Sequence, residues 1–380
     1  MAGFFVNSHC FQMSPFHKSL LLKRLFSIKV LDVRCYLPGG RMSAPLLLLP
    51  TLWLLASCGG DSDRHLPDVS NISVNIKLQR FEQDLFQLDT SDLPAGMQQL
   101  TGKYPALLPL FALNIIHDQT NPAETPLQSV GNFLRAPEVR HLNDTVQQLY
   151  GNLDWLERDL SQMFRYYQYY LPDKPIPQVA TIVSEFGTDA FTAGDSLCGI
   201  GLDMYLGENF PGYNPEIFPD YIRRQFRREY IPVRLAKALA RNAVEAPSGQ
   251  RLLDLMLYHG KQLYLVDCLL PLVADSAKMG YTRAQLEGSE GNEQQVWARL
   301  LTQKLLYSTD FGKFKKLVTP SPNAPVVFQE APGEVGNWLG WQIVKSYMKR
   351  HPETTMAQLL HLSDAQKFLE EAKYKPRRPL

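Results

Sequence analysis

A short apolar segment near the N-terminus limits how much of this 380-residue chain can enter a folded domain. Residues 45–55 hold seven leucines and Trp53, and no charged residue. Such an eleven-residue run lies within the ~7–15 residues of a signal-peptide core and falls short of the ~20 that a membrane-spanning helix needs. The segment is typical of a signal peptide, so residues 1–57 are left out of the expected fold.

The residues that follow this segment favour lipid attachment. Leu55-Ala56-Ser57-Cys58 comes first, and the polar stretch Gly-Gly-Asp-Ser-Asp comes directly after it. Leucine, two small residues and cysteine are similar to the bacterial lipobox, which implies cleavage between Ser57 and Cys58 and a diacylglyceryl group on the Cys58 thiol. Several acyl chains anchor a protein stably, whereas one chain binds a membrane only marginally. The alternative is an ordinary buried cysteine in an apolar helix.

Four segments are expected along the chain. Residues 42–57 form the signal peptide, residues 58–70 the lipidated cysteine with a flexible tether, and residues 71–380 a single domain. Residues 1–41 carry six basic residues and one acidic residue, and fit poorly before such a signal. They are either an over-long start assignment or an extended basic n-region.

Charge and cysteine content exclude some classes of function. The formal net charge is +1 for the whole chain and −4 for the part that begins at Cys58. The chain therefore has no excess of basic residues that would favour nucleic acid, and no nucleic-acid partner is expected. Two cysteines remain in the expected domain, Cys198 and Cys268. We expect two buried free thiols, with one disulfide as the alternative.

Hydrophobic periodicity predicts an α+β fold that is predominantly α-helical: one large domain with a small sheet near its N-terminal half. Strands are expected at residues 70–78, 178–185 and 198–205, the last two paired as a hairpin. The expected helices are 80–88, short helices within 93–111, then 138–150, 153–171, 220–229, 232–244, 251–270, 282–307, 334–349 and 356–360. The aromatic-rich part of the 153–171 helix is expected to lie in the core.

No motif of a known catalytic or metal site is present. None of the eight histidines begins an H-E-x-x-H, and no two lie four apart on an expected helix. The chain also lacks a G-x-S-x-G elbow and a P-loop. The sequence therefore predicts no catalytic residue, no metal and no cofactor.

One polar cluster within the 251–270 helix is the best local candidate for chemistry. It consists of Asp254, Tyr258, His259 and Lys261, next to Gly260. A glycine inside a helix costs about 1 kcal/mol relative to alanine, so it usually marks close packing or a site. Asp254 and Lys261 are seven residues apart and share one helix face. A satisfied structural network is the favoured interpretation, and a proton-transfer site is the alternative.

Other charged and glycine-rich stretches have structural interpretations. Gly336 and Gly340, four residues apart on the 334–349 helix, favour the close approach of another backbone. The arginines at positions 223, 224, 227 and 228 are expected to form a solvated face paired with acids, with phosphate or lipid headgroups as the alternative.

Several ordered stretches together resemble the GldB family of gliding motility-associated lipoproteins of Bacteroidota. Besides the lipobox at Cys58 they are Arg80-Phe81, Ser184-Glu185-Phe186-Gly187, Ile200-Gly201-Leu202-Asp203, Tyr258-His259-Gly260-Lys261, Tyr307-Ser308-Thr309-Asp310, Gly336-Asn337-Trp338-Leu339-Gly340 and Tyr374-Lys375-Pro376. The similarity covers residues 45–378. It implies an envelope lipoprotein tied to the gliding machinery and no known catalytic residue.

A fainter resemblance concerns predicted HExxH zinc proteases. In those proteins the first helix after the sheet carries the metal motif, but the corresponding residues 231–238 contain neither His nor Glu. The third-ligand helix would correspond to the region of His259. The resemblance implies a zincin-like scaffold that has lost its metal centre, because a catalytic zinc normally needs three protein ligands.

The combined prediction is a non-enzymatic protein of the cell envelope, lipid-anchored at Cys58, that supports gliding or surface secretion by contacting envelope protein partners. An outer-membrane anchor is expected, and the side on which the domain lies stays open. Two alternatives are a divergent hydrolase or peptidase-like enzyme around Asp254, Tyr258, His259 and Lys261, and a sugar- or peptide-binding lipoprotein that uses the aromatic residues of 155–170.

Overall fold

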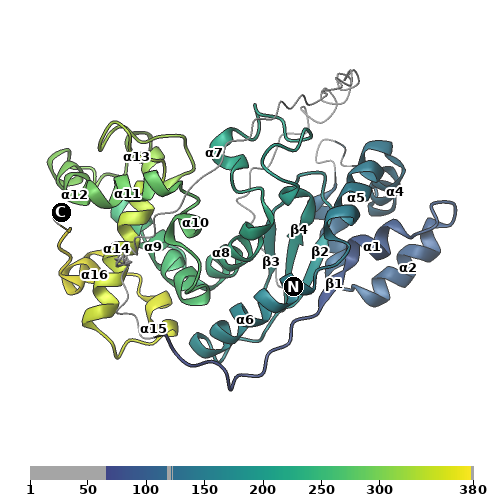
Figure 1. Cartoon of the computed structure of the whole chain (residues 1–380), viewed down its shortest axis with the longest axis horizontal. Coiled ribbons are helices and arrows are strands. Elements are labelled where there is room, and N and C mark those ends of the chain that lie inside the picture. The colour runs from purple at the N-terminus through teal and green to yellow at the C-terminus, as the bar shows by residue number, and fades with distance from the viewer. Residues whose placement is uncertain (1–65, 118–120, 122, 378–380) are drawn as a thin grey trace, which may run out of the picture. The chain divides into compact units, whose positions relative to one another are not determined.

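The computed structural model describes residues 66–117, 121 and 123–377, and its elements from Val69 onward belong to one compact unit (Figure 1). The predicted lipidation and cleavage residues, Cys58 and Ser57, lie outside the described residues. The helices are α1 (Phe81–Phe86), α2 (Leu93–Lys103), α3 (Leu107–Leu110), η2 (Phe111–Ile115), α4 (Pro126–Arg135), α5 (Pro137–Tyr150), α6 (Asp154–Tyr170), η3 (Leu202–Tyr205), α7 (Asp220–Arg223), η4 (Arg228–Tyr230), α8 (Ile231–Ala243), α9 (Leu252–Leu269), α10 (Asp275–Met279), α11 (Arg283–Gly291), α12 (Glu293–Thr302), α13 (Phe311–Val318), α14 (Val335–Arg350), α15 (Met356–His361) and α16 (Ala365–Ala372).

The fold class agrees with the prediction: an α+β domain, mostly helical, with one four-stranded sheet in its N-terminal half. Most expected helices are present. The expected 220–229 helix is instead two short pieces, α7 and η4, and the expected 282–307 helix ends at α12 and breaks near Asn292 into α11 and α12. No helix among the described residues has the length and apolar character needed to span a bilayer.

The sheet corrects the expected hairpin. Its strands are β1 (Leu78–Arg80), β2 (Gln178–Ile182), β3 (Ala190–Ala193) and β4 (Leu197–Gly201), in the order β1-β2-β4-β3. β2 runs parallel to both β1 and β4, so the two strands expected to form a hairpin do not form one. β4 instead pairs antiparallel with β3, through a turn at Gly194 with a positive φ of 61°.

The expected strand at residues 70–78 is also wrong, because the strand begins only at Leu78. Side chains before Leu78 alternate between buried and exposed, as in a strand. Their backbone, however, is held by side chains of α6: the Ile76 N–H donates to Ser161 Oγ at 2.9 Å and the Leu78 N–H to Glu157 Oε1 at 3.0 Å. Alternation reports which face is buried, and does not by itself show that a neighbouring strand is present.

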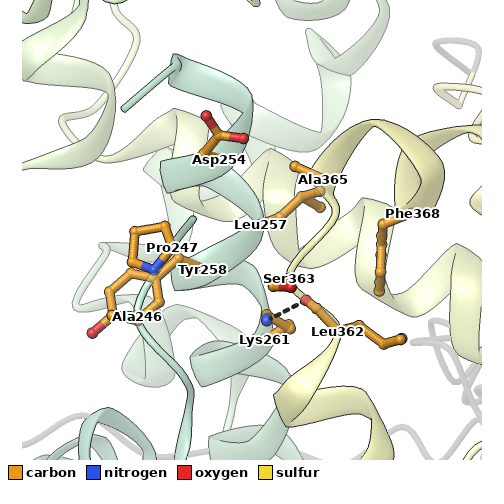
Figure 2. Close-up of a pocket in the computed structure, with 10 residues that line it drawn as sticks. All are labelled: Ala246, Pro247, Asp254, Leu257, Tyr258, Lys261, Leu362, Ser363, Ala365 and Phe368. Atoms are coloured by element: carbon orange, nitrogen blue, oxygen red, sulfur yellow. Dashed lines mark hydrogen bonds between the residues drawn. The ribbon is translucent and has the colours of Figure 1, made fainter. Parts of the chain in front are cut away.

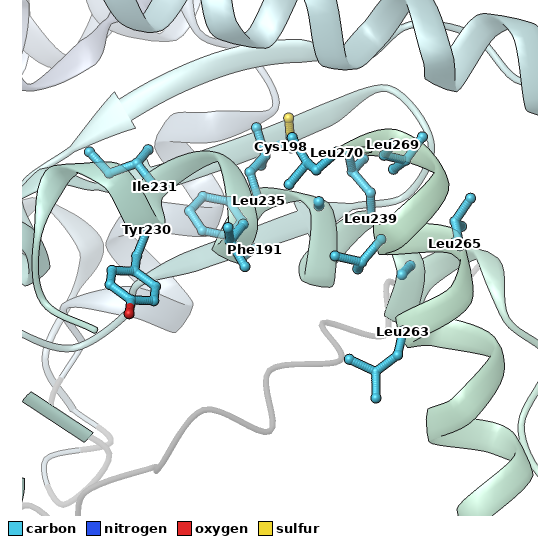
Figure 3. Close-up of a cluster of buried hydrophobic side chains, with 14 of the residues drawn as sticks. Phe191, Cys198, Tyr230, Ile231, Leu235, Leu239, Leu263, Leu265, Leu269 and Leu270 are labelled. Atoms are coloured by element: carbon cyan, nitrogen blue, oxygen red, sulfur yellow. The ribbon is translucent and has the colours of Figure 1, made fainter. Parts of the chain in front are cut away.

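The hydrophobic core continues from the sheet into helices α8 and α9. α8 packs on β3 and β4 and also on α9. The side chains that Figure 3 labels in this layer are Phe191 and Cys198 of the sheet, Leu235 and Leu239 of α8, and Leu265 and Leu269 of α9. Cys198 and Cys268 are both buried and each carries a reduced thiol, as expected.

The crossing of α9 and α14 is the closest helix contact in the C-terminal half. A Cβ on Gly340 would lie 1.9 Å from the Met256 carbonyl oxygen, and a Cβ on Gly260 would lie 2.5 Å from the Gly340 carbonyl oxygen. Real Cβ atoms do not approach that closely, so both positions need glycine. The close backbone approach predicted from these glycines is confirmed.

Candidate functional site

Three members of the predicted polar cluster line one small pocket. Asp254, Tyr258 and Lys261 of α9 face the loop at Ala246 and Pro247 and the segment that joins α15 to α16 (Figure 2). His259 is not among the lining residues; its ring packs edge-on against the Tyr258 ring, with centroids 5.0 Å apart. The one-face arrangement expected for Asp254 and Lys261 is present.

Asp254 stabilises the first turn of α9. Its Oδ2 accepts the Arg251 backbone N–H at 2.9 Å, and its two oxygens accept the Arg251 guanidinium at 3.0 and 2.7 Å. A carboxylate at this position satisfies a free N–H of the helix end and interacts favourably with the helix dipole. The Asp254 carboxylate is therefore engaged by its own helix start.

Lys261 connects α9 by hydrogen bonds to the end of α15 and to the segment between α15 and α16. Its Nζ donates to the Leu362 carbonyl oxygen at 2.9 Å and to the Leu360 carbonyl oxygen at 3.4 Å. Burial lowers the pKa of Lys261 to about 8, and the nearby Glu245 carboxylate acts in the opposite direction. The described residues include no hydrogen bond between Lys261 and Asp254, so the two share a pocket without forming the pair on which the proton-transfer alternative depends.

The pocket has a volume of about 10 Å³, which is room for about one water molecule. A substrate does not fit in a space of that size. Burial also lowers the pKa of His259 to about 4, with Arg241 acting in the same direction and Gln262 opposing it. His259 is therefore neutral at pH 7, and it lies outside the pocket that contains Lys261. The geometry favours a structural network over proton-transfer chemistry.

No group of three or more His, Cys, Asp or Glu side chains in the described parts of the chain is arranged to hold a metal ion. The first long helix after the sheet is α8, and it carries Arg234 and Lys237 on the stretch where the fainter resemblance places a metal motif. These two cations are chemically unsuited to bind a divalent metal.

A second polar cluster was not found from the sequence. Arg234 Nη1 lies 3.4 Å from Asp189 Oδ2, at the start of β3. Lys237 lies one turn further along α8. Burial, which is the larger cause, and the neighbouring Arg234 lower the pKa of Lys237 to about 8, while Glu334 opposes that shift. Burial raises the pKa of Glu334, and Lys237 opposes it. Glu334 precedes α14 with a positive φ of 64°. The spacing of Arg234 and Lys237 on α8 was the one signal available in the sequence.

The Ser184–Gly187 stretch, one of the family-like motifs, is held by a buried carboxylate. Asp203 is fully buried; its Oδ1 accepts the Ser184 N–H at 3.1 Å and its Oδ2 accepts the Phe186 N–H at 2.6 Å. Glu185 and Phe186 both have positive φ, at 54° and 64°. Burial raises the pKa of Asp203 to about 6, against the two backbone N–H donors. Asp203, from one family-like motif, therefore holds the strained loop at residues 184–187, which is another such motif, next to the sheet.

The aromatic and arginine-rich stretches are largely structural. Phe164, Tyr166 and Tyr167 are buried, as expected for the core face of α6. Tyr169 is exposed, but its ring is inclined at 89° to that of Tyr170, so the two do not form a flat platform for a sugar ring.

Two of the four arginines in the expected cluster pair with acids. Arg223 pairs with Asp220, the Arg227 guanidinium lies 3.1 Å from the Glu229 carboxylate, and Arg228 lies 4.9 Å from the Trp155 ring centroid. Arg224 instead donates to Gln285 Oε1 at 3.4 Å, and Arg223 and Arg224 are only partly exposed, so the interpretation as a solvated face paired with acids holds for part of the cluster.

Comparison with known families gives one match, to a model described as gliding motility protein GldB, which aligns with residues 62–376. Comparison with curated proteins and with solved structures finds no match.

Proposed function

The chain belongs to the family of the gliding motility protein GldB, and we propose that it acts as a lipid-anchored protein of the cell envelope that supports gliding or surface secretion through protein–protein contacts. Association with gliding motility follows from the family. The anchor, the non-enzymatic mode of action and the partners are the proposed part. The observation that carries the proposal is the extent of the match, which spans nearly the whole domain and every motif of the resemblance from Arg80-Phe81 to Tyr374-Lys375-Pro376. The lipobox at Cys58 lies before the matched residues.

The position of the match supports the anchor. It begins at residue 62, within the polar stretch that directly follows Cys58. The matched region thus starts within the expected tether, residues 58–70, four residues after Cys58. An acylated Cys58 would hold this domain within the tether's reach of a bilayer, which in this proposal is the outer membrane. The anchor would thereby raise the effective concentration of the domain for other proteins at that membrane.

The described side chains support a non-enzymatic mode of action. The pocket beside Asp254, Tyr258 and Lys261 holds about one water molecule, and Asp254 is already engaged by Arg251. A divergent hydrolase at this cluster would need a larger opening and His259 in reach of it. A protein that works by contact needs neither.

Mass spectrometry of the mature N-terminus tests the anchor directly. We expect the native protein to begin at Cys58, with a diacylglyceryl thioether on the thiol. A mature protein that begins upstream of Cys58, or that stays entirely in the aqueous phase after detergent partitioning, would contradict the proposal. Cys58→Ser is the matched variant, because it changes one atom and should leave the protein unprocessed.

Deletion of the gene in a gliding host tests the cellular role. We expect reduced colony spreading or reduced secretion of surface proteins, restored by the wild-type chain and not by Cys58→Ser. His259→Ala should restore both, provided that the variant accumulates to the wild-type level. Full spreading and secretion in the deletion strain would contradict the gliding role, and a His259→Ala protein that is folded but inactive would favour the enzyme alternative.

A further inference from the structure

A continuous surface segment, residues 299–316, exposes large apolar side chains where the domain meets solvent. It runs from the last turn of α12 through a connecting turn and into α13. Leu301, Tyr307 and Phe311 are 46%, 49% and 45% exposed. We call this stretch the basic-aromatic segment.

The same segment concentrates positive charge. It holds five basic residues and one acidic residue, Asp310, in a chain whose formal net charge is +1. The basic residues, all exposed, are Arg299, Lys304, Lys313, Lys315 and Lys316. Among them, Lys313 lies 3.3 Å from Asp310. Positive charge and exposed rings therefore occur together on a domain that is otherwise close to neutral or acidic.

Helix α13 shows how the fold presents these side chains. Phe314, Leu317 and Val318 are buried, and α13 packs on α9 and α14. Phe311 and Lys315 are four residues apart, so they lie next to each other on the edge of the face that points away from this core. α13 is thus an amphipathic helix whose outer face combines an aromatic ring with lysines.

The turn before α13 holds the segment in a defined shape. Lys304 follows the C-terminal cap of α12 and has a positive φ of 55°, and the Leu305 N–H donates back to the Leu300 carbonyl oxygen at 2.9 Å. The Lys313 N–H then donates to the Asp310 carbonyl oxygen at 3.1 Å. The exposed side chains are therefore carried on ordered backbone.

We propose that the basic-aromatic segment docks on the headgroup region of an anionic bilayer. Tyrosine and phenylalanine rings enter the interface between water and hydrocarbon, and lysines beside them reach anionic headgroups with their ammonium groups. The three apolar side chains are each about half exposed and share the segment with exposed cations, which suits shallow insertion among lipids, whereas a protein partner's anchor residues usually fill pockets. The inference rests on the proposed function, because an acylated Cys58 holds the domain close to the bilayer, where a weak surface contact becomes occupied.

The test uses the full-length acylated protein inserted into vesicles of phosphatidylcholine, with or without phosphatidylglycerol. Hydrogen–deuterium exchange of the peptides that cover residues 299–316 is the readout. We expect exchange there to slow about tenfold in phosphatidylglycerol vesicles compared with neutral ones, and this slowing to disappear in high salt. Each lysine strengthens binding to an anionic surface by about fivefold.

Two variants separate the charge from the rings. The triple variant Lys313→Glu, Lys315→Glu, Lys316→Glu should lose the protection in anionic vesicles, and Tyr307→Ser with Phe311→Ser should lose most of it. The matched control, Arg140→Glu with Lys349→Glu and Lys367→Glu, changes the net charge equally at three exposed sites outside the segment and should keep the protection. Unfolding curves verify that each variant is folded.

The outcomes distinguish the anchor from the docking surface. Protein that sediments with neutral vesicles but shows equal exchange at residues 299–316 in both vesicle types overturns the docking proposal and leaves the anchor intact. Protein that fails to associate with neutral vesicles overturns the anchor. Protection that appears with an acidic protein from the envelope and not with anionic vesicles also overturns the docking proposal.

Discussion

Helix α9 buries a lysine-containing polar group towards each end, and the two groups use their charges differently. The N-terminal group is Asp254, Tyr258, His259 and Lys261. The C-terminal group is Asp267, at the end of α9, with Lys278 and Asp275 of α10 and Lys345 of α14. Lys261 is 5% exposed and Lys278 is 1% exposed, so burial is similar. What differs is the partner that each ammonium group has.

Within the described part of the chain, Lys278 is paired with carboxylates, whereas Lys261 donates hydrogen bonds only to backbone carbonyl oxygens. Lys278 Nζ lies 2.5 Å from Asp267 Oδ1 and 3.0 Å from Asp275 Oδ1. Lys345 extends the network to Asp275 at 3.1 Å. Removing one member of a buried ion pair leaves an uncompensated charge, whereas removing a donor to two carbonyls leaves two weak acceptors. The two groups should therefore differ strongly in their contribution to stability, although the sequence analysis singled out only the N-terminal one.

The largest loss of stability is expected when the close backbone crossing of α9 and α14 is disrupted, because both polar groups depend on that crossing. Gly340→Val should cost about 4 kcal/mol or more, because the new side chain would collide with the Met256 carbonyl oxygen and separate α9 from α14. Both polar groups should then be lost together. Urea unfolding measures the change. Gly288→Ala in α11 is the control: no atom lies within 4 Å of its added Cβ, so it should stabilise the domain slightly. Equal effects of the two variants would contradict the close crossing.

Lys278→Met should cost about 3 kcal/mol, because Asp267 stays buried without its closest cation. Lys345, 3.9 Å from Asp267, offsets only part of the loss. The double variant Lys278→Met with Asp267→Leu should recover most of the stability, since it removes both charges from the interior. Urea unfolding of the two variants measures the coupling between the residues. A loss below about 1 kcal/mol in Lys278→Met would show that the C-terminal group is no more strongly coupled than the N-terminal one.

Part of this comparison was readable from the sequence. The glycines at 260, 336 and 340 indicated close helix packing. The crossing of α9 and α14 confirms it for Gly260 and Gly340, and the approach of Leu317 of α13 confirms it for Gly336. The seven-residue spacing correctly placed Asp254 and Lys261 on one face. Their partners were not readable. Arg251 lies only three residues before Asp254, but the carbonyls that bind Lys261 belong to residues about a hundred positions further along the chain.

The predicted strand pairing in the sheet was wrong for a related reason. β3 has four residues and little alternation, so it gave no strand signal, and without it the two neighbouring apolar runs looked like a hairpin. The cluster of Asp189, Arg234, Lys237 and Glu334 comes from three separate elements and has no local pattern. Local periodicity predicts which face a residue occupies, but pairing between distant elements is decided by the whole fold.

Acid should destabilise the N-terminal group through His259. Its pKa is about 4 in the folded domain and 6.5 in the unfolded chain. Between these values the unfolded state binds one proton more than the folded state, so stability falls as the pH decreases from 6.5 to 4. We expect a loss of about 2 kcal/mol in the wild type relative to His259→Gln. Unfolding curves across this pH range measure it. The rise in Asp203 pKa acts with the opposite sign, but it is present in both proteins and cancels in the difference. Parallel curves for the two proteins would contradict the burial of a neutral imidazole.

The smallest effect is expected for Lys261→Met, because the ammonium group that is removed has no carboxylate partner to leave behind. At pH 7 the two carbonyls lose their donor while the cost of burying a charge disappears, so the net change should be about 1 kcal/mol or less. The sign of its pH dependence is the sharper measurement. The pKa of Lys261 falls from 10.5 in the unfolded chain to about 8 in the folded domain. Between pH 8 and 10.5 the unfolded state binds more protons, so the wild type should gain stability relative to Lys261→Met as the pH rises. A loss near that of Lys278→Met, or a wild type that weakens relative to the variant in that range, would mean that Lys261 has an anionic partner after all and that the two ends of α9 are alike.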